Sequence, residues 1–330
     1  TGAATPRARI RQRQVTVAAG LHLNAWDAPH GELELDLAVV NAALLELRSR
    51  ASTRLSLGEG VTLTGDLQAR IETEILEIQS VGARIEGGIR VSGGGVGAGV
   101  FAYLQGGSIE GATTFACDYG VLAGITIDST VFDPGGLLSI TRGSEPTPAS
   151  VVPGGTPGLP FARTSTHPRR AATPERAIVL RNLRQAPGSV LVADVSSPVT
   201  IENCSFTGSG ILPVVSLEGL PGPVRISNCE FNGQGLAVSD CRGDVVLANN
   251  RVQLRDAMAP GLAVDAASAS LGTNSVTGTG VTGLALDVSG SAVATALELA
   301  GDLALVLGSG SIHARRRADR PAWLPARRDS

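Results

Sequence analysis

The chain has 330 residues and a formal net charge of −3 at pH 7, and all 27 of its basic residues are arginines because the sequence contains no lysine. Mechanisms that need a lysine base or a lysine Schiff base are therefore excluded. Its 42 glycines and its content of only 3% aromatic residues leave few bulky side chains for a large globular core. This composition favours a solenoid, which escapes the limit of about 250–300 residues on a single core.

Both ends of the chain are basic. We expect residues 1–14 and residues 313–330 to be solvated segments outside the folded part, because charged termini are commonly poorly ordered. No run of 18 apolar residues occurs, so we expect no membrane span, and we do not expect nucleic acid as a partner. The arginines concerned are Arg7, Arg9, Arg11, Arg13, Arg315, Arg316, Arg317, Arg320, Arg327 and Arg328.

Residues 15–312 carry an internal repeat. In the first half of the chain a three-residue pattern recurs as Leu63-Thr-Gly65, Ile85-Glu-Gly87 and Ile109-Glu-Gly111, with spacings of 22 and 24 residues. Alternating apolar and polar residues punctuated by glycine predict short, half-buried strands joined by tight turns. A repeat of about 22 residues is too short for a helical pair and suits one turn of a solenoid.

The repeat stops between residues 142 and 176. This segment is rich in proline and glycine, as in Val151-Val-Pro-Gly-Gly-Thr-Pro-Gly-Leu-Pro160. Long loops in compact proteins are often functional or disordered. We therefore expect an insertion that leaves one coil, lies beside the solenoid and rejoins the next coil.

The repeat resumes at residue 177 with two strand types. One type is represented by Val199-Thr-Ile-Glu-Asn-Cys204 and Val224-Arg-Ile-Ser-Asn-Cys229, and the other by Gly261-Leu-Ala-Val-Asp-Ala266 and Gly283-Leu-Ala-Leu-Asp-Val288. In parallel strands stacked about 4.8 Å apart, equivalent residues form ladders. We align the sixth position of the first type into one ladder, with spacings of 22, 25, 21 and 24: Asn182, Cys204, Cys229, Asn250 and Asn274.

These patterns predict an all-β chain that forms a right-handed parallel β-helix solenoid of about ten to twelve coils. A leucine-rich repeat would show a different signature, and an antiparallel sandwich would not keep polar residues in register every 22 positions. Over about residues 30–312 the repeat resembles that of the pectate-lyase-like superfamily. In this chain Asn182, Asn250 and Asn274 resemble the inward asparagine ladders of that superfamily. The resemblance is one of repeat pattern and not of a catalytic motif.

The resemblance implies that acidic residues on an outward strand face, sometimes with calcium and a basic residue, would act on a sugar. Asp265 and Asp287 occupy one position on successive coils, and Arg255 is the basic candidate. Two stacked carboxylates repel each other unless one is protonated, an arginine is close or a cation bridges them. The pair is thus a candidate catalytic or calcium site, with two solvated aspartates as the alternative.

Other polar residues are candidates for ligand binding. Arg225, Arg251 and Ser239 would suit an acidic sugar, although the arginines also fit plain surface charge. Four cysteines in a chain of this length do not form a disulfide scaffold, and their spacings match no metal site. Cys204 and Cys229 would be close enough for a disulfide, or would form two buried thiols.

Two functions of different classes follow from the sequence. The first is a non-catalytic structural or recognition protein in a surface, phage-tail-like or injection assembly, with protein partners or self-association, no cofactor and an extracellular location. The alternative is a polysaccharide lyase or glycoside hydrolase that acts on an acidic glycan, with calcium as its cofactor. Glycan binding without cleavage lies between them. Fold resemblance alone does not decide among these functions.

Overall fold

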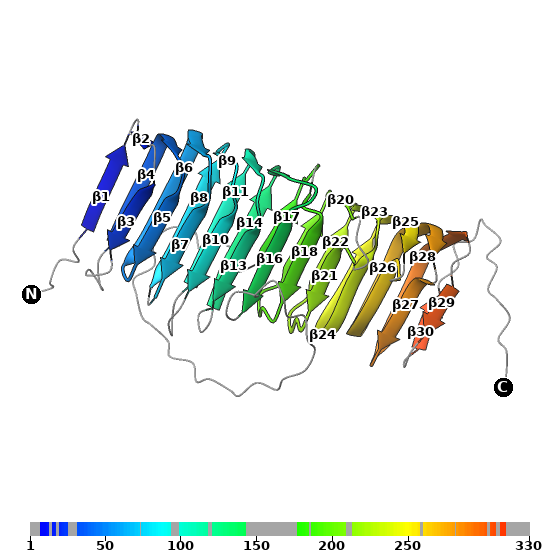
Figure 1. Ribbon diagram of the computed structural model, residues 1–330. Coiled ribbons are helices and arrows are strands. Elements are labelled where there is room, and N and C mark those ends of the chain that lie inside the picture. The colour runs from blue at the N-terminus through cyan, green and yellow to red at the C-terminus, as the bar shows by residue number, and fades with distance from the viewer. Residues whose placement is uncertain are drawn as a thin grey trace, which may run out of the picture.

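The computed structural model describes residues 7–12, 15–17, 20–25, 32–72, 74–93, 99–117, 121–142, 177–184, 186–208, 213–257, 260–280, 282–301, 304–307 and 311–314. Within these residues the regular structure consists of strands, and none of them belongs to a helix long and apolar enough to cross a membrane. The strands pair in parallel and stack into one elongated solenoid, with β1 near one end and β29 and β30 near the other (Figure 1).

The first ladder of strands, called face A, runs the whole length of the solenoid. Each coil adds one parallel strand to it. Face A contains β1 (Arg7–Gln12), β4 (Glu32–Ala42), β6 (Ser52–Leu63), β8 (Ile75–Val81), β11 (Gly99–Gln105), β14 (Val121–Asp128), β17 (Ile178–Arg181), β19 (Val199–Glu202), β22 (Val224–Ser227), β24 (Leu236–Ala248), β26 (Leu262–Gly280), β28 (Ser291–Gly301) and β30 (Ser311–Ala314).

The second ladder, face B, follows face A in each coil. The later parts of β4, β6, β26 and β28 turn into it without a break. Its other strands are β2 (Val15–Val17), β9 (Arg84–Ile85), β12 (Ser108–Ile109), β15 (Val131–Phe132), β20 (Ser205–Thr207), β23 (Glu230–Gly233) and β25 (Arg251–Ala257).

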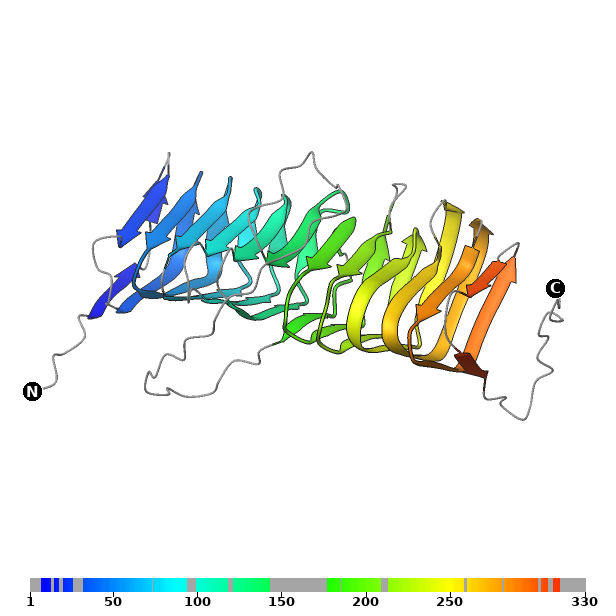
Figure 2. The same ribbon diagram turned by 90° about the horizontal axis from the view of Figure 1, so that it is seen from below.

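The third ladder, face C, closes each coil. The first parts of β24 and β26 belong to it, and Figure 2 shows the stack from below. Its other strands are β3 (Leu21–Ala25), β5 (Leu45–Ser49), β7 (Leu67–Ile71), β10 (Ile89–Gly93), β13 (Thr113–Cys117), β16 (Leu137–Arg142), β18 (Ser189–Ala193), β21 (Val215–Glu218), β27 (Thr282–Val288) and β29 (Ala304–Leu307).

The all-β parallel solenoid expected from the repeat is confirmed. It makes about nine turns, slightly fewer than the ten to twelve coils expected. The right-handed sense stays an expectation from the general preference of parallel crossovers.

The boundaries differ at both ends. Strand β1 lies inside the expected basic segment 1–14 and pairs with β4, so that Arg9 stands opposite Glu34 in the backbone register. Strand β30 continues to Ala314, two residues into the expected tail. Most of the insertion, residues 143–176, and the remaining tail, residues 315–330, lie outside the described residues.

Aliphatic ladders fill the interior. On face A the inward positions carry Leu35, Leu55, Ile78, Ile125 and Ile178 on different coils, and each is fully buried. Burying such a side chain stabilises the fold by about 1.5–3 kcal/mol. Aromatic rings contribute on face B, where Phe206 and Phe231 stack with their centroids 5.3 Å apart. Thus period-2 alternation along each strand becomes a continuous core along the solenoid.

The corner between faces A and B depends on left-handed backbone conformations. In the second half of the solenoid this position is held mostly by asparagine, which tolerates positive φ better than other side chains with a Cβ. Earlier coils use Gly82 and Gly106 at the same corner. The residues other than glycine have φ values of 54–56° and are Ser129, Asn182, Asn203, Asn228 and Asn249.

The expected polar ladder therefore divides into two rows. Strand β17 pairs with β19 through Ile178 opposite Val199, one residue off the alignment made from the sequence. This register places Asn182 in the exposed row with Asn203, at the left-handed corner. The inward row consists of Cys204, Cys229, Asn250 and Asn274, all buried. A one-residue shift matters because it moves a side chain to the opposite side of the strand.

Asn250 joins three coils in the inward row. Its side-chain oxygen accepts a hydrogen bond from Cys229 N at 3.0 Å, and its Nδ2 donates to Ile226 O at 3.0 Å. Asn274 Oδ1 accepts from both Asn250 N and Asn250 Nδ2, at 3.1 and 3.0 Å. Since these groups are buried, the asparagine ladder satisfies backbone atoms that no water reaches.

We expect Asn250→Ala to lower the free energy of unfolding by about 2–4 kcal/mol, because buried Cys229 N and Ile226 O lose the asparagine side chain as a partner and Asn274 Oδ1 loses one of its two hydrogen bonds. Urea denaturation followed by circular dichroism measures this change. The matched control is Asn232→Ala, which removes a half-buried asparagine from the outer side of β23 and should cost less than about 1 kcal/mol. Equal costs for the two variants would contradict the structural role of the ladder.

Candidate functional site

A shallow groove of about 360 Å³ lies on the outer side of face A. Strands β8, β11, β14 and β17 contribute to it, so it crosses the coils on both sides of the insertion. Outward side chains and small residues line it, which is what a ligand-binding surface on a solenoid requires. The lining residues are Glu77, Ile78, Gln79, Phe101, Ala102, Tyr103, Gly124, Thr126, Val179 and Arg181.

The groove exists because large and small residues alternate between neighbouring coils. Phe101 and Tyr103 are half-buried and point outward from β11, on either side of the inward Ala102. In the next coil the register shifts between Val100 and Phe101, which sets Gly124 opposite Phe101. Thr126 stands opposite Tyr103. The two half-buried rings therefore border a floor of small residues.

Polar groups flank the rings on β8. Gln79 stands opposite Tyr103 and Glu77 opposite Phe101 in the backbone register. Glu77 Oε2 accepts two hydrogen bonds from Arg54, from Nη2 at 2.8 Å and from Nε at 3.0 Å. Both bonds use the same carboxylate oxygen. The side of the groove formed by β8 thus offers an amide and a carboxylate that can pair with ligand hydroxyl groups.

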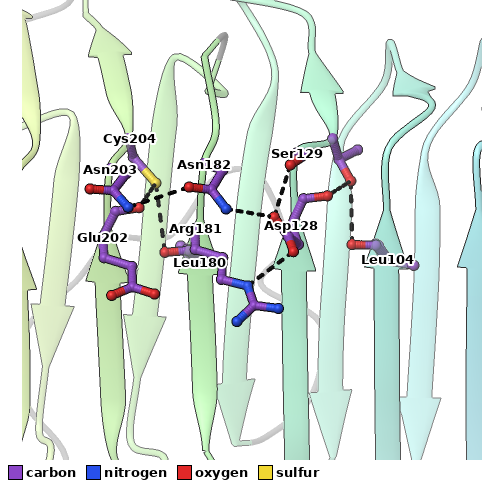
Figure 3. Close-up of polar contacts among 10 residues, drawn as sticks. Leu104, Asp128, Ser129, Leu180, Arg181, Asn182, Glu202, Asn203 and Cys204 are labelled. Carbon is purple, nitrogen blue, oxygen red and sulfur yellow. Dashed lines mark hydrogen bonds and ion pairs between the residues drawn. The ribbon is translucent and has the colours of Figure 1, made fainter.

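Arg181 bounds the other side of the groove. Its Nε donates to Asp128 Oδ2 at 3.0 Å, and the side chains of Arg181 and Asp128 are 39% and 10% exposed. Figure 3 shows that the terminal nitrogens of Arg181 point away from Asp128. The ion pair therefore holds the stem of the arginine in place and leaves its outer donors available.

The Asp128 carboxylate is fixed by two further hydrogen bonds (Figure 3). Its Oδ1 accepts hydrogen bonds from Asn182 Nδ2 and Ser129 Oγ, both at 2.9 Å. Asn182 Oδ1 in turn accepts from Asn203 Nδ2 at 3.3 Å. Burial opposes ionisation of Asp128, but the bonds from Asn182 and Ser129 and the charge of Arg181 outweigh it and hold the pKa of Asp128 below its usual value of 3.8.

The acidic pair expected from the sequence lies elsewhere, on face C. Asp265 on β26 stands directly opposite Asp287 on β27, and both are exposed. Asp265 Oδ2 accepts a hydrogen bond from Asp240 N at 3.3 Å. The described residues contain no group of three or more acidic, histidine or cysteine side chains that could hold a metal ion. Calcium takes about six to eight oxygen ligands, so the two carboxylates would have to be completed by backbone carbonyl groups and water.

The basic and polar candidates are spread over the three faces. Arg225 lies on face A, while Arg251 and Arg255 lie on β25 of face B. Ser239 lies on face C, where the first part of β24 pairs with β21 and Ser239 stands opposite Glu218. Asp265 and Asp287 therefore do not share a face with Arg255, and the structure does not bring the expected catalytic set together.

The two candidate cysteines are buried and free. Cys204 and Cys229 belong to successive coils of the inward row, and their thiols donate to Glu202 O and Ser227 O, each at 3.2 Å. The neighbouring Cys229 thiol, together with burial, raises the pKa of the Cys204 thiol. A thiol kept protonated in this way is a poor nucleophile.

Sequence reasoning did not identify the groove. None of its principal lining residues is among the candidates named from the sequence: Phe101, Tyr103, Glu77, Gln79 and Arg181. The alternation of Val100-Phe-Ala-Tyr-Leu104 already indicates that both rings face outward. Their proximity to Arg181, however, depends on the parallel register across the long insertion.

Comparisons of the chain with protein-family models, with curated proteins and with solved structures give no match. The likeness to the pectate-lyase-like superfamily therefore remains a likeness of the repeat. The function has to be argued from the groove and from the carboxylates themselves.

We expect Asp128→Asn to lower the free energy of unfolding at pH 7 by about 1–2 kcal/mol, because a hydrogen-bonded charge is lost at a mostly buried position. Since the folded-state pKa is depressed, the stability that Asp128 contributes is present above the usual aspartate pKa of 3.8 and is lost as the pH falls through the folded-state value. Urea denaturation of both proteins between pH 7 and pH 2.5 should show the two curves converging at low pH. A difference independent of pH would contradict an ionised Asp128.

We expect Asp265→Asn to raise the free energy of unfolding slightly, by about 0.2–1 kcal/mol at low ionic strength, because like charges directly opposite each other in neighbouring strands repel. Salt should reduce this gain, as it screens exposed charges. Thermal unfolding at 10 mM and 500 mM NaCl measures the change. Strong stabilisation of the parent protein by calcium, absent with sodium, would instead show that a cation bridges the two carboxylates.

Proposed function

We propose that this protein is a non-catalytic recognition element whose groove on face A binds an extended glycan. The observation that carries the proposal is the pair of half-buried aromatic rings, Phe101 and Tyr103, side by side on one strand above a floor of small residues. Aromatic faces pack against the apolar face of a sugar ring, and the neighbouring amide, carboxylate and guanidinium groups suit sugar hydroxyls.

The shape of the groove supports an extended ligand. It crosses four parallel strands, so a ligand lying along the solenoid axis meets a new strand about every 4.8 Å. The backbone beneath is held by ladder hydrogen bonds on both sides and does not need to rearrange on binding. A rigid surface loses little conformational entropy when it binds a polymer, which favours recognition.

A catalytic role has weaker support. Cleavage of a glycosidic bond would need two carboxyl groups, or a carboxyl group and a base, around one sugar. Glu77 is engaged by Arg54 and Asp128 by Arg181, whereas Asp265 and Asp287 lie on another face, apart from the groove. We therefore favour a recognition element of a surface, phage-tail-like or injection assembly. We also propose that the protein binds other proteins of that assembly.

The test is binding to a panel of soluble polysaccharides, measured by affinity electrophoresis and isothermal titration calorimetry. We expect Phe101→Ala with Tyr103→Ala to weaken the binding of the ligand by about tenfold or more, because each aromatic contact contributes about 0.5–1.5 kcal/mol beyond its area. The control is Leu137→Ala, which removes a side chain that is 37% exposed on β16 of face C and should leave binding unchanged.

The same incubations also test the catalytic alternative. New reducing or unsaturated ends, released by the parent protein and lost in Asp265→Asn/Asp287→Asn, would make the protein an enzyme acting on face C. Binding that survives loss of both aromatic rings would show that the glycan is bound elsewhere on the solenoid.

A further inference from the structure

The outer side of face A is more acidic than basic around the groove. Between β4 and β22, the described strand positions that point outward carry five acidic side chains and three arginines. The acidic residues are Glu34, Asp36, Glu77, Asp128 and Glu202, and the arginines are Arg54, Arg181 and Arg225. A surface with this balance does not attract a polyanion.

Arg181, which borders the groove, has a carboxylate on each neighbouring coil, and one of the two forms an ion pair with it. Asp128 lies on the preceding coil at 3.0 Å from its Nε. On the following coil Glu202 stands directly opposite Arg181 in the parallel register, so the two side chains leave neighbouring strands about 4.8 Å apart. Figure 3 shows the Glu202 carboxylate extending to the same side as the Arg181 guanidinium group.

We infer that the groove recognises uncharged glycans and that Glu202 determines this specificity by excluding anionic ones. The inference rests on the proposed function and concerns the same groove. Arg181 then acts as a hydrogen-bond donor to hydroxyl groups, because its terminal nitrogens are oriented outward and its charge is balanced. Asp128 is a positioning residue, which holds the guanidinium group through Nε and does not itself reach the ligand.

An anionic sugar at Arg181 would bring its carboxylate or sulfate beside Glu202. The ligand anion and the Glu202 carboxylate would repel each other strongly where the protein limits access of water, and only weakly where salt screens their charges. A neutral sugar gains the same hydrogen bonds and ring contacts without this repulsion. The acidic glycan considered from the sequence is therefore the ligand class that this groove disfavours.

The test compares full-length protein binding to a neutral β-glucan, to polygalacturonate and to chitosan, at 20 mM and 500 mM NaCl. We expect the neutral glucan to bind better than polygalacturonate, with an affinity that changes less than twofold with salt. Chitosan, a polycation, should be attracted by the acidic surface at 20 mM NaCl and lose this advantage at 500 mM NaCl. We expect Glu202→Gln to leave neutral binding unchanged and to raise affinity for polygalacturonate about three- to tenfold at low salt, with most of the gain lost at high salt. The control is Glu230→Gln, which replaces a half-buried glutamate on face B. It should leave the affinities for the neutral glucan and for polygalacturonate unchanged.

The outcomes separate the inference from the proposed function. Polygalacturonate binding more tightly than the neutral glucan to the parent protein, or chitosan binding more tightly than the neutral glucan at 500 mM NaCl, would overturn the inference while leaving glycan recognition in place. If Glu202→Gln and Glu230→Gln change the affinity for polygalacturonate equally, Glu202 has no specific role in excluding anionic glycans. If no polysaccharide of the panel binds, the proposed function fails and the inference falls with it.

Discussion

The parallel hydrogen-bond ladder between coils is the interaction on which the rest of the structure depends. Within the solenoid, each strand forms backbone hydrogen bonds with the coil before it and with the coil after it. Equivalent residues of successive coils therefore lie about 4.8 Å apart. This constraint turns a loose repeat of the sequence into continuous rows of side chains. The aliphatic core, the asparagine ladder and the left-handed corner are three consequences of it.

The same ladder creates the groove. A row that carries Phe101 in one coil and Gly124 in the next is necessarily stepped, because the backbones beneath the two residues are held at a fixed separation. Tyr103 beside Thr126 repeats the step. A hollow on a solenoid therefore needs no loop or second domain. It needs only a change of side-chain size between two coils in register.

Charge on the surface follows the same logic. Arg54 faces Glu77 and Arg181 faces Asp128 because they are register partners on adjacent strands. Such pairs contribute little to stability where they are exposed, but they decide which groups remain available to a ligand. Arg181 keeps its outer donors while its charge is paired with Asp128.

The sequence by itself determined the architecture, because period-2 alternation and a spacing near 22 residues are local features that any register preserves. It also placed Asp265 opposite Asp287, since the two strands share the same six-residue pattern. Only the tertiary structure decided that Asn182 belongs with Asn203 and not with Cys204, because one residue of shift leaves the spacing almost unchanged but reverses the side of the strand. The position of Arg181 at the groove of Phe101 and Tyr103 likewise follows only from the folded structure, because a long insertion separates these residues in the chain and the parallel ladder alone places them on one surface.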